Sequence, residues 1–194
     1  MRPADATGMG EVLLRIARVA IARRLVIAAS ADDSATWLDE PGATFVTLKQ
    51  EGALRGCIGS LEPHRALRDD IHENAIAAAF HDPRFVPLAR EEFDMLSIEV
   101  SLLSPAEPLA CCDEADAIRK LLPGRDGVIL ELGARRATFL PQVWESLPDP
   151  RRFLAELKQK AGLPADYWSD ALRVSRYGVE KWSESELSAA GGVK

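Results

Sequence analysis

The stretch Leu-Arg-Gly-Cys-Ile-Gly at residues 54–59 contains the side chains best suited to chemistry. A cysteine attacks substrates as its thiolate, a form that a neighbouring cation favours. Period-two alternation along a strand would place Arg55 and Cys57 side by side on one face. Gly56 and Gly59 would allow another backbone or a ligand to come close. The alternative is a small buried cysteine packed beside glycines, because cysteine is among the most buried residue types.

Three further residues, a glutamate and two histidines, are candidates for proton transfer. Glu99 lies mid-strand on the face opposite the aliphatic side chains, and a carboxylate there could act as a general base if it lined a cleft. His81 or His64 could partner Cys57 as a base. The simpler alternatives are a glutamate that faces water and histidines that are solvated. We take Cys57, Glu99 and His81 as the candidate catalytic residues.

Arg84 and Asn74 extend the candidate site to ligand binding, together with the arginine and the two glycines of residues 54–59. Arg84 lies between a proline and a phenylalanine and could clamp a carboxylate or a phosphate. A surface or lobe-bridging salt bridge is the alternative. Asn74 lies at the edge of an apolar helical stripe, where its amide must find hydrogen-bond partners. Bracing of a loop against the helix is favoured there over contact with a ligand.

The common cofactor and metal motifs are absent from the sequence. It has no phosphate-binding P-loop, no dinucleotide fingerprint after a strand and no nucleophile elbow. It has no two cysteines separated by two intervening residues (C-x-x-C), and its three histidines match no zinc-ligand spacing. We therefore predict neither a cofactor nor a metal.

Strand and helix patterns mix along the chain without regular alternation. Two tight hairpins, over residues 43–61 and 127–140, require antiparallel pairing, and residues 50–52 are expected to form a three-residue loop in the first. The class is therefore α+β with antiparallel-rich sheets. The main elements expected beside the hairpins are helices over 10–29, 63–80, 113–122 and 150–161 and strands over 97–103 and 171–182.

Residues 1–9 are expected to form a flexible arm and residues 184–194 a flexible tail, so that residues 10–183 make a single domain. At 194 residues, the chain is long enough to bury a sizeable core. Its most apolar stretch, residues 12–29, contains four arginines, each costing about 2.5–3.5 kcal/mol near a bilayer centre. We predict no membrane segment.

The formal charge is −6, from 24 basic and 30 acidic residues, with a pI of about 5.2. Nucleic-acid binding normally requires a basic excess or stripe, so this class of ligand is disfavoured. Only the arginine pairs at 23–24, 135–136 and 151–152, with Lys158 and Lys160, suggest a basic patch. Three cysteines, two of them adjacent, cannot form a disulfide framework, which points to a reducing, cytoplasmic compartment.

The 54–59 stretch resembles the signature of the AMMECR domain family, and further blocks follow in that family's order. They lie at residues 74–75 with 82–85, 98–101, 138–144 and 160–163, so that the resemblance spans about residues 10–183. The family commonly has two prolines after the Arg-Phe pair, whereas Val86 stands here before the single proline.

The resemblance implies two unequal α+β lobes around a cleft. It also implies a bacterial protein of the AmmeMemoRadiSam system, protein A, acting with a radical-SAM protein and a Memo-like protein. The family supplies no established catalytic residues, so the roles above rest on the residues themselves. The leading hypothesis is a cleft-based small-molecule or protein-modifying function with Cys57 as reactive thiol and a small anionic ligand. A non-catalytic interaction module of the same system is the alternative, and whether the protein is an enzyme stays open.

Overall fold

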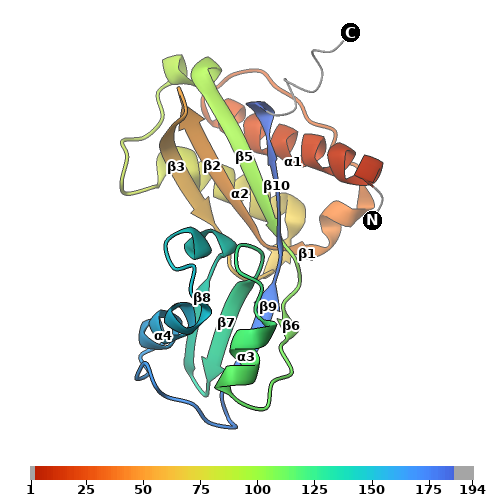
Figure 1. Cartoon of the computed structure of the whole chain (residues 1–194). Helices are drawn as coiled ribbons and strands as arrows, with labels where there is room; N and C mark the ends of the chain where they lie inside the picture. The colour runs from red at the N-terminus through yellow and green to blue at the C-terminus, as the bar shows by residue number, and fades with distance from the viewer. Residues whose placement is uncertain (1–2, 186–194) are drawn as a thin grey trace. The chain divides into compact units, whose positions relative to one another are not determined.

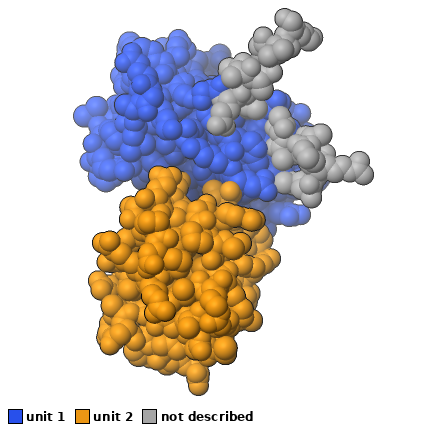
Figure 2. Space-filling view, in the orientation of Figure 1, with its two compact units in different colours: residues 1–103, 180–194 blue, residues 104–179 orange. Residues whose placement is uncertain are grey.

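The computed structural model describes residues 3–185 and divides the chain into two compact units. Unit 1 comprises residues 1–103 and 180–194, and unit 2 comprises residues 104–179 (Figure 2). Each unit combines helices with antiparallel pairing, and each has its own hydrophobic core. The predicted α+β class is therefore confirmed.

Unit 1 is built on a four-stranded sheet with the order β10-β5-β2-β3. The strands are β2 (Thr44–Gln50), β3 (Ala53–Gly59), β5 (Leu96–Leu103) and β10 (Val179–Ser183). Strand β2 pairs antiparallel with both β3 and β5, so its residues connect the two neighbours in register. Val46 of β2 lies between Ile58 of β3 and Val100 of β5, and all three contribute to one apolar face.

Two helices supply most of the rest of this core: α1 (Pro3–Arg24) and α2 (Leu67–Phe80) (Figure 1). The predicted stripe of α2 is buried, including Ile71, Ala75 and Ala78. Because side chains alternate along a strand, the residues between the core positions lie on the other face of the sheet. That second face carries the polar residues from which the candidate site is built.

The β2–β3 hairpin differs from its predicted form in two ways. The turn has two residues, Glu51 and Gly52, both with positive φ (53° and 81°), whereas three loop residues were expected. The register then shifts: Leu48 faces Gly56, but Lys49 faces Leu54. One β3 residue between these pairs has no partner on β2, which is a β-bulge at the position of the candidate arginine.

Unit 2 contains a second four-stranded sheet with the order β6-β9-β7-β8. Its elements are β6 (Glu107–Pro108), α3 (Glu114–Lys120), β7 (Gly127–Leu132), β8 (Arg135–Phe139), η3 (Pro141–Glu145), α4 (Pro150–Lys160) and β9 (Arg173–Tyr177). The predicted β7–β8 hairpin is confirmed, with Gly133 at φ 59°. Trp144 stacks on Phe153 at 3.7 Å between ring centres and anchors the core.

Two predicted boundaries are wrong. Helix α1 runs from Pro3 to Arg24, although a helix over 10–29 was predicted, so most of the expected N-terminal arm is helical. The single strand predicted over 171–182 is two strands, β9 and β10, which belong to different sheets. The break is at Gly178, whose backbone leaves the ladder to bond both ways with Ser104. Of the predicted tail, residues 186–194 lie outside the described residues.

Helix α1 ends in an unusual cap. Ile27 donates its backbone N–H to the Ala22 carbonyl and Val26 donates to the Arg23 carbonyl, which is the bonding pattern of a Schellman motif. The left-handed position of that motif is normally glycine, but here it is Val26, with φ 59° and 84% exposure. A β-branched residue in this conformation is strained. Arg90 stabilises the end by donating to the carbonyls of Leu25 and Val26.

The remaining elements of unit 1 are short: η1 (Thr36–Asp39), β1 (Pro41–Gly42), β4 (Arg65–Ala66) and η2 (Arg90–Met95). Strands β1 and β4 pair with each other as a two-stranded ribbon. None of the helices within residues 3–185 combines the length and the apolar character needed to cross a membrane.

Candidate functional site

Cys57 is a partly exposed free thiol on the sheet face that α1 and α2 do not cover. Its register partner on β2 is Thr47, and the Thr47 Oγ1 lies 3.2 Å from the Cys57 Sγ. The hydroxyl and the thiol can therefore share a hydrogen bond, in either direction. A thiol that is neither sealed in the core nor fully solvated is the condition that the reactive interpretation required.

The backbone of Cys57 is held by the segment that follows α2. Strand β3 is at the edge of its sheet, so one side of its backbone has no strand partner. There, the Cys57 N–H donates to Asp82 Oδ2 at 2.9 Å, and Arg84 Nη2 donates to the Cys57 carbonyl at 3.2 Å. Asp82 and Arg84 also pair with each other, at 2.6 and 2.9 Å. Together they act as a substitute strand that fixes Cys57 in place.

The two side chains of the Asp82–Arg84 pair differ strongly in solvent exposure. The Asp82 side chain is 2% exposed, whereas that of Arg84 is 54% exposed. The hydrogen bonds from Arg84 hold the pKa of Asp82 far below its ordinary value, against the opposing effect of burial. The same hydrogen bonds raise the pKa of Arg84, with a smaller contribution from the nearby Cys57 thiol. A permanent cation therefore bonds to the Cys57 carbonyl, and its carboxylate partner Asp82 is buried beneath it.

Arg55 does not play the part predicted for it. Its guanidinium binds both oxygens of Glu92 in η2, at 2.8 and 3.0 Å. Arg55 is the unpaired residue of the β-bulge, and bulges redirect side chains from strict alternation. The guanidinium groups of Arg55 and Arg84 lie 6.0 Å and 5.5 Å, respectively, from the centre of the Phe85 ring. Arg84, rather than Arg55, is the guanidinium that bonds to Cys57.

The two glycines beside Cys57 are needed for packing. A Cβ on Gly56 would come within 2.1 Å of the Ala78 carbonyl oxygen, so α2 packs directly against the β3 backbone there. A Cβ on Gly59 would overlap the ring of Phe45, its register partner on β2. The close backbone approach expected of these glycines is thus made by the protein itself. Contact of either glycine with a ligand stays a prediction.

Glu99 lies on the same sheet face, because it pairs with Thr47 in the β2–β5 register. Contrary to the simpler expectation of a solvated glutamate, it is buried. Lys49 Nζ binds one carboxylate oxygen and Lys181 Nζ the other, each at 2.6 Å. Burial alone would raise the pKa of Glu99, but the hydrogen bonds from Lys181 and Lys49 outweigh it and lower the pKa. This suits a charged anchor better than a general base.

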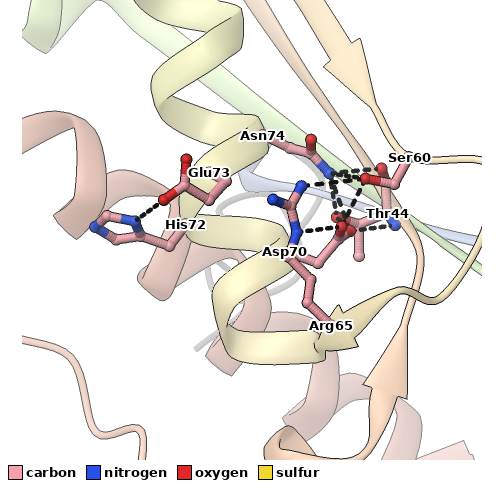
Figure 3. Close-up of polar contacts among 7 residues, drawn as sticks. All are labelled: Thr44, Ser60, Arg65, Asp70, His72, Glu73 and Asn74. Atoms are coloured by element: carbon pink, nitrogen blue, oxygen red, sulfur yellow. Dashed lines mark hydrogen bonds and ion pairs between the residues drawn. The ribbon is translucent and has the colours of Figure 1, made fainter.

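Asn74 belongs to a separate polar cluster, centred on the buried carboxylate of Asp70 (Figure 3). The Asn74 amide donates to Asp70 Oδ2 at 2.9 Å, to the Thr44 carbonyl at 3.0 Å and to Ser60 Oγ at 3.2 Å. Asp70 also accepts the Thr44 N–H at 2.7 Å and a hydrogen bond from Arg65. These bonds tie α2 to the ends of the hairpin strands, which is the bracing role favoured for Asn74.

The structure does not bring the histidines to the thiol. His81 is the exposed cap residue of α2, and no contact with the Cys57 sulfur is found for it among the described residues. His64 is exposed and lies 3.1 Å from Glu62. A proton-transfer role for His81 therefore stays a prediction without geometric support.

The basic patch considered for nucleic acid is weakened by one of its members. Lys158 is fully buried, and its Nζ binds Glu114 at 2.8 Å, so it is not part of any surface. Within residues 3–185, no cluster of three or more His, Cys, Asp or Glu side chains could hold a metal ion.

Sequence reasoning missed four residues that complete the site: Thr47, Lys49, Asp82 and Lys181. The alternation that placed Cys57 and Glu99 on the polar face would also have placed Thr47 and Lys49 there. Asp82 stands next to a proline two residues before Arg84, a spacing at which an aspartate readily bonds the following backbone. Lys181 had no local signal, because its position depends on the break at Gly178.

The fold and these contacts define an α+β protein whose larger unit presents a clamped, partly exposed thiol on one face of an antiparallel sheet. Comparison with known families identifies it further: the AMMECR1 family model matches residues 14–182. The chain belongs to the AMMECR1 family, as its sequence blocks indicated.

Relatives with similar sequences occur in archaea and bacteria. A protein of Methanothermobacter thermautotrophicus is 40% identical over 184 residues, covering 90% of this chain and 94% of its own length. A protein of Thermotoga maritima is 41% identical over 140 residues, covering 71% and 75%. The crystal structure of the uncharacterised protein PH0010 from Pyrococcus horikoshii superposes with a TM-score of 0.73 at 39% identity, covering 90% of this chain and 91% of that one. The shared fold thus extends over nearly the whole chain.

Proposed function

We propose that this protein uses Cys57 as a reactive thiol in a small-molecule- or protein-modifying reaction, with Arg84 binding an anionic group of the substrate. The observation that carries the proposal is the setting of Cys57: its sulfur is partly exposed and lies 3.2 Å from Thr47 Oγ1, and its backbone carbonyl accepts a hydrogen bond from the Arg84 guanidinium. The exposed guanidinium of Arg84 can bind a carboxylate or phosphate of a substrate. In the reaction, the sulfur would bond to an electrophilic carbon, the thiol proton would pass to water, and the leaving group would depart with the electrons of the broken bond.

The remaining charged groups are assigned supporting roles. Glu99 is held ionised by two lysines and lies two strands from Cys57, so we give it an electrostatic role rather than proton abstraction. Arg55 and Glu92 form a bidentate pair that anchors η2 to the bulged strand. A reducing cytoplasmic compartment, the predicted location, belongs to the proposal because the thiol must stay free.

The test is alkylation of the folded protein by iodoacetamide at neutral pH, followed by mass spectrometry of the cysteine peptides. The exposed Cys112 provides an internal reference in the same sample. We expect Cys57 to react at least as fast as Cys112, and the Thr47→Val variant to react more slowly at Cys57 alone. Absence of labelling at Cys57 until the protein is unfolded would overturn the proposal.

A second function is favoured by the pairing of the charges around the thiol. Arg55, Arg84 and Glu99 each have an ion-pair partner within unit 1, as expected for a surface that is complete without a substrate. On this basis, the protein would be a non-catalytic module that presents the face to a radical-SAM protein and a Memo-like protein. Co-purification with these two partners tests it: a Cys57→Ser variant should keep the complex, and loss of the complex in that variant would contradict it.

A further inference from the structure

The ion pairs on the Cys57 face share an orientation that bears on what this face binds. At Glu99, the carboxylate is 11% exposed, whereas its partners Lys49 and Lys181 are 34% and 47% exposed. The Arg84–Asp82 pair has the same arrangement, with the cation outward. A ligand that approaches the face therefore meets cations first, although the chain as a whole carries a charge of −6.

The two lysines also retain hydrogen-bonding capacity. An ammonium group has three donors, and each lysine gives one to a different oxygen of Glu99. No other partner of either ammonium is found among the described residues, so two donors on each can still be used. Two cations around one carboxylate leave a local charge of +1 at the point where the free donors lie.

We infer that Lys49 and Lys181 form an anion-binding subsite for a carboxylate or phosphate group on the same sheet face as Cys57. Cys57 and Glu99 are both register partners of Thr47, so they lie two strands apart, which corresponds to about 10 Å. An extended ligand would place its anionic end between the lysines and its reactive end at the sulfur. In that full form the inference rests on the proposed function, whereas the subsite can be tested without the thiol.

The first experiment compares two alkylating agents that share a reactive group and differ in charge. Iodoacetate is anionic and iodoacetamide is neutral, so the ratio of their rates at Cys57 measures local attraction of an anion. At low ionic strength, we expect Lys49→Gln and Lys181→Gln each to lower that ratio about two-fold, the effect of one unit charge at about 10 Å in water. Each single variant leaves Glu99 with one lysine partner, so the fold is kept.

Two control variants test the sign of this charge effect and its dependence on the position of the charge. Glu99→Gln keeps both lysines and removes the negative charge that both of them bind, so the ratio should rise about two-fold. Arg23→Gln makes the same change in net charge as the lysine variants, but on helix α1, which covers the other face of the sheet. Its ratio at Cys57 should equal that of the wild type, and the ratio at Cys112 should be unchanged in every variant.

The second experiment is independent of the thiol. Isotopically labelled, unalkylated protein is titrated with inorganic phosphate and, separately, with succinate. Binding should shift the amide NMR signals of Thr47 and Glu99, and the lysine variants should lose the shift. The titrant that acts identifies the anion as phosphate or carboxylate. Unchanged rate ratios and unchanged titrations in both lysine variants would overturn the subsite. An unreactive Cys57 with a lysine-dependent titration would instead overturn the proposed function and leave the subsite standing.

Discussion

Two buried carboxylates in unit 1, Asp70 and Asp82, are held by the same device. Each is almost completely buried, at 1% and 2% side-chain exposure, and each pairs with a partly exposed arginine, Arg65 or Arg84. Each also accepts a backbone N–H from the hairpin strands. The difference lies in what else the carboxylate contacts.

Around Asp70, the remaining partners are the hydroxyls of Thr44 and Ser60 and the amide of Asn74. All of these groups form hydrogen bonds that tie α2 to the sheet. Around Asp82, the bonded strand residue is Cys57, whose partly exposed sulfur contacts the Thr47 hydroxyl. A buried carboxylate with an arginine is therefore a structural brace in both places, and the side chain that it positions determines whether chemistry can follow.

The largest effect is expected at Asp70. Asp70→Ala would leave the Thr44 N–H and the Asn74 amide buried without their main acceptor, so we expect a loss of about 3 kcal/mol of unfolding free energy. Urea unfolding followed by circular dichroism measures it. Asp69→Ala, one residue earlier on the exposed side of α2, is the control and should change stability by less than about 0.5 kcal/mol.

Asp82→Ala should cost less, about 2 kcal/mol, because the Arg84 side chain can turn into water and only backbone N–H groups, those of Cys57 and Arg84, lose Asp82 as acceptor. Hydrogen exchange of the Cys57 amide should become faster, since its acceptor is gone. If this variant were as destabilised as Asp70→Ala, or if its Cys57 amide stayed protected, the distinction between the two clusters would fail.

Much of this arrangement follows from local sequence rules. The antiparallel hairpins and the buried stripe of α2 were predicted and are confirmed. On β5, the position of Glu99 on the face opposite the aliphatic side chains followed from alternation alone. The difference between the two clusters did not, because Asp70 and Asp82 accept backbone N–H groups from residues 26 and 25 positions away along the chain.

Other features depend on tertiary structure in the same way. The bulge that redirects Arg55 arises from the two-residue turn and the pairing register, neither of which composition reveals. The break at Gly178 is set by its backbone bonds to Ser104, and it carries Lys181 into the sheet of unit 1. Longer-range pairing of this kind is where local periodicity stops being informative.

A substitution away from both clusters gives a reference for the stability scale. Val26→Gly should stabilise the protein by about 1 kcal/mol, because glycine removes the cost of a left-handed β-branched residue. Val86→Gly is the matched control, since Val86 is also highly exposed but has no positive φ. The midpoint temperature of thermal unfolding should rise for Val26→Gly only. Neither variant should alter the alkylation rate of Cys57.

The smallest expected effect is the loss of the stabilising contribution of Asp82 at acidic pH. Because the pKa of Asp82 is lowered by Arg84 in the folded protein, its contribution to stability is complete above the ordinary carboxyl range and is lost as the pH falls through and below it. Asp82→Asn imitates the protonated state. The stability difference between wild type and this variant should therefore shrink between about pH 5 and pH 2. A difference that stays constant with pH would show that the charge of Asp82 does not matter.

The most direct measurement of the account compares the two arginines. Arg84→Gln and Arg65→Gln remove the same charge from equivalent positions on the two braces, and native alkylation of Cys57 by iodoacetamide is followed in both. We predict that Arg84→Gln slows the reaction several-fold at neutral pH, whereas Arg65→Gln leaves it at the wild-type rate. Equal rates in the two variants, or a Cys57 that reacts only after unfolding, would contradict the assignment of this thiol as the reactive group.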